Sequence, residues 1–112
     1  MYYEPIVIST LVNNTVFSKT MVDTGCTCYA LCDPAFVTHV NLERIPIRPF
    51  YTEAFDSKET ARPIGEVAVA EIDIEGFTDR IWCYVTPLGG YDMYLGLPWL
   101  RKRNVRIDQG GE

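Results

Sequence analysis

The tripeptide Asp23-Thr24-Gly25 carries residue types that could do acid–base chemistry. Two carboxylates about 3 Å apart cannot both ionise, so one can act as a base towards water while the other acts as an acid. A threonine hydroxyl can hydrogen-bond across to a second copy of the loop. Glycine lets a water or a peptide backbone approach closely, because it has no Cβ. The alternative is a plain turn at the end of a strand, with Asp23 in a capping role.

A second motif lies about 70 residues downstream, in the segment Tyr91–Arg101. It places a short apolar strand, Met93–Leu95, directly before Gly96. One or two helical turns are predicted over Pro98–Asn104, and a last short strand over Val105–Asp108. This order of strand, glycine and helix favours a functional role for the Asp-Thr-Gly tripeptide over a plain turn.

The elements that must position these motifs are short strands separated by turn residues, which predicts an all-β domain. The β-branched and apolar run Ile6–Val12 is followed by Asn13-Asn14, two residues that tolerate left-handed turn conformations. A second strand is predicted over Thr15–Val22. The two strands form a predicted hairpin that leads the chain into Asp23.

Further elements are predicted in the middle of the chain. A short helix is expected over Pro34–Val40, with Asp33 as its N-cap and a proline at its first position. Ile45–Pro49 is interrupted by prolines and carries no predicted element. The strands Glu66–Glu75 and Phe77–Val85 are joined by a Glu-Gly turn. One face of the first of these strands is apolar and comprises Ala68, Ala70, Ile72 and Ile74.

Length and composition limit the classes of function. A chain of 112 residues is expected to form a single domain over 1–112, and 47% hydrophobic against 22% charged residues predicts a globule. Ten basic and fifteen acidic residues give a net charge of −5, which argues against nucleic acid as a partner. No apolar run reaches the roughly 18 residues of a membrane span, and no signal peptide is recognised, so we expect an intracellular protein without a membrane partner.

The four cysteines leave two interpretations open. Cys26, Cys28 and Cys32 lie within seven residues of one another, and Cys83 stands apart. Clustered cysteines without a signal peptide favour free thiols in a reducing compartment over a disulfide framework. A zinc module is the alternative, with Cys83 or His39 as the fourth ligand, although the single-residue spacing between the first two cysteines is not that of a usual zinc knuckle. The favoured interpretation has no metal and no cofactor.

The residues quoted above carry a resemblance to a known family. Met21-Val22-Asp23-Thr24-Gly25-Cys26, the run Tyr94–Leu100 and the segment Asn104–Asp108 resemble the retropepsins, the aspartic proteases of retroviruses and LTR retrotransposons. The Leu-Gly-Leu-Pro-Trp-Leu-Arg-Lys run and the trailing Ile-Asp are most similar to gypsy-class elements of fungi. The resemblance spans roughly residues 6 to 108, nearly the whole chain.

The resemblance implies a closed β-barrel subunit with one or two short helices and a flap hairpin, which forms a homodimer with two-fold symmetry. Each subunit would give one aspartate, here Asp23, and the loop residues Thr24, Gly25 and Cys26 would hold it. The length agrees with this arrangement, because a two-lobed enzyme needs two such loops and this chain has one. The isolated monomer is therefore expected to be inactive.

The resemblance also implies a substrate site for an extended peptide or polyprotein. Tyr94 and Leu95 would flank the active-site loop, with Tyr94 lining a side-chain pocket. The flap would run from Phe50 to Pro63 and would close over the substrate. Its tip would lie near residues that we expect to contact the peptide: Phe55, Asp56, Ser57 and Lys58.

Two departures from the family pattern bear on function. Cys26 stands where the family usually has serine or alanine, and the flap segment lacks the glycines of retroviral enzymes. Cysteine is small enough to fit, so the sequence predicts an aspartic endopeptidase that uses water without a metal or covalent intermediate. The alternative is a non-catalytic retropepsin-like module that dimerises or binds peptides.

Overall fold

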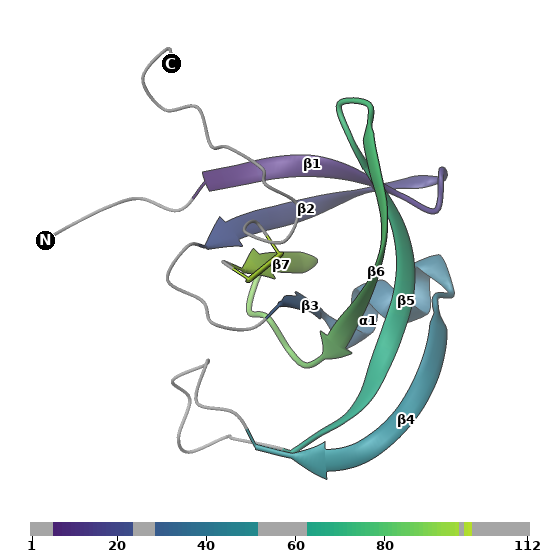
Figure 1. Cartoon of the computed structure of the whole chain (residues 1–112), viewed down its shortest axis with the longest axis vertical. Helices are drawn as coiled ribbons and strands as arrows, with labels where there is room; N and C mark the ends of the chain where they lie inside the picture. The colour runs from purple at the N-terminus through teal and green to yellow at the C-terminus, as the bar shows by residue number, and fades with distance from the viewer. Residues whose placement is uncertain (1–5, 24–28, 52–62, 97, 100–112) are drawn as a thin grey trace, which may run out of the picture.

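The computed structural model describes residues 6–23, 29–51, 63–96 and 98–99 (Figure 1). Short strands dominate this part of the chain, as the sequence predicts. Between α1 and the last strand, two long strands form the largest hairpin. In chain order the elements are β1 (Ile6–Val12), β2 (Val16–Asp23), β3 (Ala30–Cys32), α1 (Pro34–Val40), β4 (Glu43–Phe50), β5 (Ile64–Ile74), β6 (Phe77–Val85) and β7 (Met93–Gly96).

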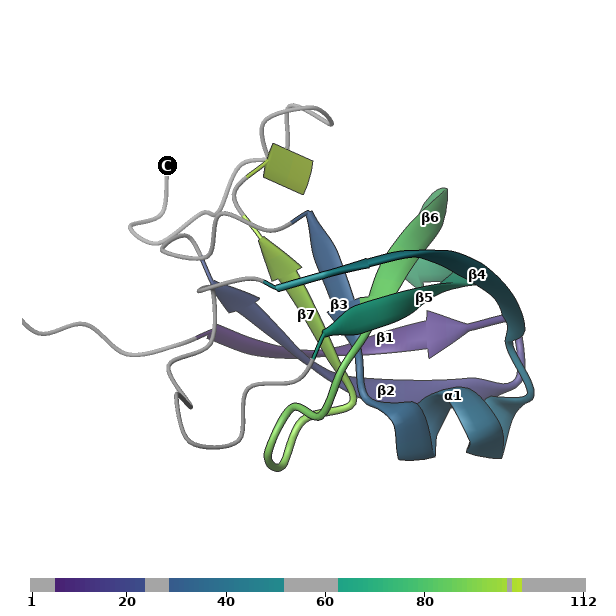
Figure 2. The same ribbon diagram turned by 90° about the horizontal axis from the view of Figure 1, so that it is seen from below.

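The strands close into a barrel. The hydrogen-bonded order is β1-β2-β7-β3-β6-β5, and β1 pairs again with β5 at Leu11 and Val12, which closes a ring of six strands. β4 pairs with β5 outside this ring and curves away from it (Figures 1 and 2). A closed ring leaves no strand edge within it exposed, which is one way a small β domain avoids aggregation. The predicted all-β barrel is confirmed.

The β1–β2 hairpin forms where the sequence predicts it. Asn13 and Asn14 both have positive φ values, 51° and 61°, as a type I′ turn requires. The backbone N–H of Thr15 donates to the carbonyl of Val12, so Thr15 belongs to the turn and β2 begins one residue later than predicted. β2 also extends one residue further than predicted, to include Asp23.

The hairpin of β5 and β6 forms one wall of the barrel. Its turn is the predicted Glu-Gly pair, with φ values of 52° at Glu75 and 92° at Gly76. Ala68, Ala70 and Ile72 are buried as predicted, and they join the barrel core. Val67 and Val69, which alternate with these residues along β5, are buried too.

The edge strand β4 is an element that the sequence analysis does not predict. Among the described residues it pairs with β5 alone, and its register shifts between Pro46 and Phe50. Proline has no backbone N–H and cannot complete a ladder on both sides, so an edge is where a strand can carry Pro46 and Pro49. These prolines also make the open edge a poor template for another strand.

The helix α1 has the predicted bounds and the predicted N-cap. The Asp33 carboxylate accepts from the backbone N–H of Ala35 at 2.9 Å, and Asn41 ends the helix in a left-handed conformation with φ of 63°. The other Asp33 oxygen accepts from the N–H of Leu88 at 2.9 Å, so Asp33 also joins the helix to the segment after β6. Of the second predicted helix, Pro98 and Trp99 are helical, and the rest lies outside the described residues.

Replacement of Asp33 by alanine is expected to lower the free energy of unfolding by about 2 kcal/mol, because a helix cap and a second hydrogen bond are lost together. The Asp33→Asn variant keeps one side-chain acceptor, so it should lose about half as much. Urea unfolding followed by circular dichroism measures both values. Equal losses in the two variants would mean that the carboxylate charge, not its two hydrogen bonds, stabilises this corner.

The barrel interior is filled by apolar side chains from every strand of the ring, with α1 packed against one end. The core comprises Val12, Val22, Ala30, Cys32, Phe36, Val37, Leu42, Ala68, Ala70, Ile72, Ile81, Cys83, Met93, Leu95 and Trp99.

No helix in the described part of the chain is long and apolar enough to cross a bilayer.

Candidate active site

The two sequence motifs meet at one end of the barrel. β2 and β7 are parallel neighbours, and in their register Val22 pairs with Leu95 and Asp23 pairs with Gly96. On the other side of β7, β3 runs antiparallel, and the N–H of Gly96 donates to the carbonyl of Tyr29 at 3.0 Å. The end of β7 therefore lies between Asp23 and Tyr29, the two described residues that flank residues 24–28 in the sequence.

The strands that hold Asp23 in place are anchored in the core. Val22 and Leu95 are both buried, and Leu95 has no exposed surface. Burial of these neighbours fixes the backbone position of Asp23 against that of Gly96. The predicted loop residues Thr24, Gly25 and Cys26 lie outside the described residues, as do Phe55, Asp56, Ser57 and Lys58 of the predicted flap tip.

The two remaining predicted site residues lie on opposite faces of β7. Leu95 points into the barrel core and can support the site from inside it. Tyr94 is half-buried on the outer face, where it packs with a second apolar group. We call this group the aromatic floor: Leu31, Tyr84, Leu88, Tyr91 and Tyr94.

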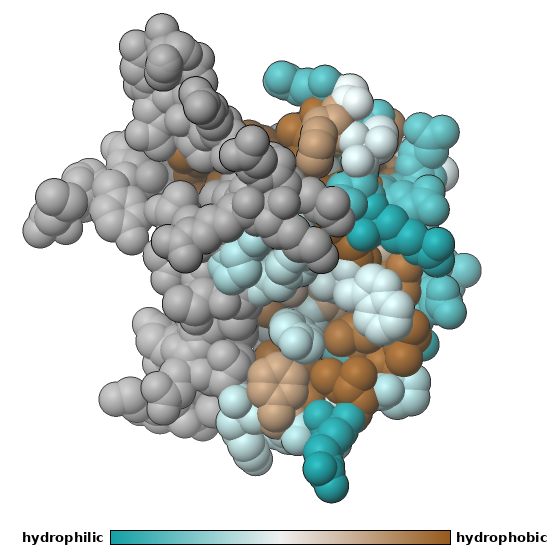
Figure 3. Space-filling model, in the orientation of Figure 1, coloured by the Kyte–Doolittle hydropathy of each residue, from teal (hydrophilic) through white to brown (hydrophobic). Residues whose placement is uncertain are grey.

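Strand register explains how the aromatic floor forms. Leu31 of β3 pairs with Tyr94 of β7 on one side and with Tyr84 of β6 on the other, so the three side chains lie in a row across the sheet. Phe50 at the end of β4 extends the row, with its ring 5.1 Å from that of Tyr84. Figure 3 shows apolar residues and residues of intermediate hydropathy side by side over β4, β5 and β6.

Most of the aromatic floor is missed by sequence reasoning. Tyr84 alternates with Cys83 on β6, so its outward position could be inferred from the strand period alone. The positions of Leu31 and Leu88 could not be inferred from the sequence, because both residues come from segments whose pairing depends on long-range register. Tyr94 is the one member that the sequence analysis selects.

Comparison with known proteins places this geometry in a family. The family model of the PEG10/RTL1 protease domain matches residues 19–110, which include both motifs. The chain belongs to this family. No curated protein matches the sequence.

Solved structures give the protease domain the same fold. The retroviral protease-like domain of Ddi1 from Leishmania major is 14% identical, with a TM-score of 0.62, and the match covers 95% of this chain and 81% of that one. The EIAV protease in complex with the inhibitor HBY-793 is 12% identical, with a TM-score of 0.68, and the match covers 97% of this chain and all of the other. The predicted retropepsin-like fold is confirmed.

Two cysteines of the protease domain form a buried pair inside the barrel. Cys32 and Cys83 are both free thiols without exposed surface. A hydrogen bond with Cys83 and burial raise the pKa of Cys32 well above its ordinary value of 9.0, and the nearby charges of Asp33 and Asp92 add to the effect. Cys32 is therefore held as a neutral thiol inside the barrel.

No group of three or more metal-binding side chains occurs among the described residues. Cys26 and Cys28, the other two ligands of the alternative zinc module, lie outside them.

The raised pKa of Cys32 makes a prediction for stability in alkali. The pKa of Cys32 is higher in the folded protein than in the unfolded chain. The contribution of the Cys32 thiol to the free energy of unfolding is therefore complete below about pH 9, and it is lost as pH rises towards the folded-state pKa. Between these values the free energy of unfolding should fall more steeply in the wild type than in Cys32→Ala, by up to about 1.4 kcal/mol per pH unit. Urea titrations at a series of pH values measure both slopes. Identical slopes would contradict the shift.

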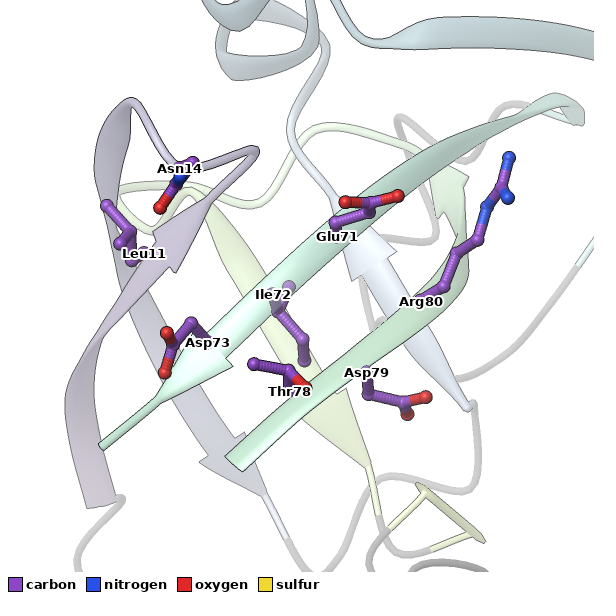
Figure 4. A pocket seen from close by; sticks show the side chains of 8 residues that line it. All are labelled: Leu11, Asn14, Glu71, Ile72, Asp73, Thr78, Asp79 and Arg80. Carbon is purple, nitrogen blue, oxygen red and sulfur yellow. The ribbon is translucent and has the colours of Figure 1, made fainter. Parts of the chain in front are cut away.

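A polar depression of about 570 Å³ lies at the other end of the β1–β2 hairpin from Asp23 (Figure 4). Two of its carboxylates already have structural partners: Asp73 accepts from the N–H of Gly76, and Asp79 accepts from the indole N–H of Trp99. The depression therefore belongs to the hairpin ends rather than to the candidate site. Its lining comprises Leu11, Asn14, Glu71, Ile72, Asp73, Thr78, Asp79 and Arg80.

Proposed function

We propose that this protease domain is an aspartic endopeptidase that acts as a homodimer. The observation that carries the proposal is the pairing of Asp23 with Gly96, within a chain that belongs to a protease family. A single Asp-Thr-Gly tripeptide per chain supports a dyad made of Asp23 and its counterpart in a second subunit on the two-fold axis.

The dyad would hydrolyse a peptide bond without a cofactor. One carboxylate, in its ionised form, takes a proton from water, which attacks the carbonyl carbon of the substrate. The other carboxylate, in its protonated form, donates to the carbonyl oxygen. Since the pair must share one proton, activity should be greatest at acidic to neutral pH. Thr24 would fix the geometry of the two loops, and Gly25 and Cys26 would leave room for the peptide.

The substrate would bind as an extended strand between the barrel and the flap. Tyr94, packed on the aromatic floor, would line a pocket for an apolar side chain next to the scissile bond, and Leu95 would support it from the core. Residues 55–58 would contact the peptide from the flap. We further propose that the substrate is the polyprotein of a retrotransposon, of the gypsy class, and that the enzyme works inside the cell.

The test combines cleavage with oligomeric state. The purified protein is incubated at about pH 5, where a carboxyl dyad shares one proton, with a denatured polyprotein-like substrate, with and without pepstatin. Sedimentation in the same buffer gives the dimer constant. Cleavage that pepstatin blocks and that follows the dimer concentration supports the proposal. A dimer that binds peptide without cleaving it supports the non-catalytic module instead.

A further inference from the structure

The segment between β6 and β7 is held at both ends by hydrogen bonds to Asp33. Near its start the N–H of Leu88 donates to Asp33, and at its end the carbonyl of Asp92 accepts from the N–H of Asp33 at 3.0 Å. The glycines between them, Gly89 and Gly90, have positive φ values of 58° and 110°, which allow a tight reversal. The segment is therefore fixed, although both glycines are exposed.

Asp92 also binds the backbone of β2 at Lys19. Its carboxylate accepts from the N–H of Lys19 at 2.8 Å, and its own N–H donates to the carbonyl of Lys19 at 2.9 Å. These two hydrogen bonds hold Lys19 beside Asp92, which directly follows Tyr91. Lys19 lies four residues before Asp23 on the same strand. The ion pair found among the described residues joins Arg44 and Glu66, so the Lys19 ammonium forms none with their carboxylates.

The partner of the Lys19 ammonium is an aromatic ring of the floor. The Lys19 ammonium lies 5.1 Å from the ring centroid of Tyr91, within the range of a cation–π contact. The Tyr91 ring meets that of Tyr94 edge to face, with centroids 5.7 Å apart and an interplanar angle of 72°. Lys19, Tyr91 and Tyr94 thus form a continuous chain of contacts from β2 to the pocket proposed above.

We propose that Lys19 is a positioning residue for specificity: through Tyr91 it fixes the orientation of Tyr94 and so the size of the pocket beside the scissile bond. This inference rests on the proposed function, because it assigns the pocket to a peptide side chain. Without the ammonium, the half-buried Tyr91 ring loses its cation–π partner, so its orientation and the geometry of its edge-to-face contact with Tyr94 are less restrained. The pocket then discriminates less between large and small side chains.

The test measures binding, so that it does not depend on catalysis. Two labelled octapeptides differ only at their two central positions, which are phenylalanine in one and alanine in the other. Their Kd values are measured by fluorescence anisotropy in the Asp23→Asn background. Lys19→Met should reduce the preference for the phenylalanine peptide by about two- to fivefold, the range that an exposed cation–π contact supports.

Two matched variants separate positioning from a change in charge or stability. Lys19→Arg keeps a cation over the ring and should restore the preference. Arg80→Met removes a positive charge at the other end of the barrel and should leave the preference unchanged. An unchanged preference in Lys19→Met, an equal loss in Arg80→Met, or no binding of either peptide would overturn the inference. The proposed function fails separately, if the wild type binds these peptides and cleaves no substrate.

Discussion

Replacement of Asp23 by asparagine is expected to lower kcat for peptide cleavage by about 100- to 10,000-fold, the range attributed to a positioned acid–base group. Asparagine has nearly the shape of aspartate, but it can neither accept the proton of the attacking water nor share one with a second carboxylate. Val22 and Leu95 remain buried in the variant, so the fold should be retained. Peptide cleavage followed by chromatography gives the rate, and circular dichroism checks the fold.

The matched control is Asp73→Asn, the same chemical change in the depression at the far end of the barrel. Asp73 accepts a hydrogen bond from the N–H of Gly76, which an asparagine oxygen can also accept, so kcat should be unchanged. Cleavage by the Asp23 variant at the wild-type rate, still blocked by pepstatin, would show that another group activates the water.

Mixing the wild-type protein with the Asp23→Asn variant tests whether one active site needs an aspartate from both subunits. If the dyad takes one Asp23 from each chain, an equimolar mixture at constant total concentration contains about a quarter wild-type dimers by random pairing, and activity should fall to that level. Subunits that work independently would retain about half of the activity. The measurement requires exchange of subunits before assay, which a fluorescence-transfer signal between labelled chains can follow.

Local signals made much of the fold predictable. The Asn-Asn turn, the Asp-Pro start of α1 and the Glu-Gly turn each restrict the backbone within a few residues, and all three appear where the sequence places them. β4 was not predictable in this way, because prolines weigh against a strand locally. Whether they are tolerated depends on the strand lying at an edge, which is settled by its pairing with β5.

The candidate site was predictable in a different way. The alternation of apolar residues does not indicate that Asp23 and Gly96 are neighbours. The order of the two motifs and their resemblance to the retropepsins predicted that these motifs lie together. The aromatic floor depends on the register of β3 with both β6 and β7, which brings Leu31 between Tyr84 and Tyr94. A shift of one residue would turn these side chains to the other face, and no local pattern specifies that register.

The two tryptophans show the same limit. Trp82 is 54% exposed and Trp99 only 2%. Trp82 alternates with the buried Ile81 and Cys83 along β6, so the strand period turns it outwards. Trp99 lies three residues after Gly96, and its burial depends on contacts with the start of β6.

These contacts make Trp99 the residue with the largest expected effect on stability. Its ring meets that of Phe77 edge to face, with centroids 6.1 Å apart, and its indole N–H donates to Asp79 at 3.0 Å. Trp99→Ala should lower the free energy of unfolding by about 3–5 kcal/mol, since a large buried ring is replaced by a cavity. A small domain has only about 5–15 kcal/mol in total, so part of the population would be unfolded on warming.

Two variants divide this effect between packing and hydrogen bonding. Trp99→Phe keeps an aromatic ring and loses the indole donor, so it should lose about 1.5–3 kcal/mol, the range for a hydrogen bond to a charged acceptor. Trp82→Ala removes an exposed ring of the same type and should lose about 0.5 kcal/mol or less. Urea unfolding of the three variants is followed by far-ultraviolet circular dichroism, because replacement of a tryptophan alters the fluorescence of the protein.

Because β7 pairs directly with the strand that ends at Asp23, loosening the chain just after Gly96 should also reduce cleavage. A Trp99→Ala variant as stable as Trp82→Ala would mean that the chain after Gly96 is not held to β6 through this ring.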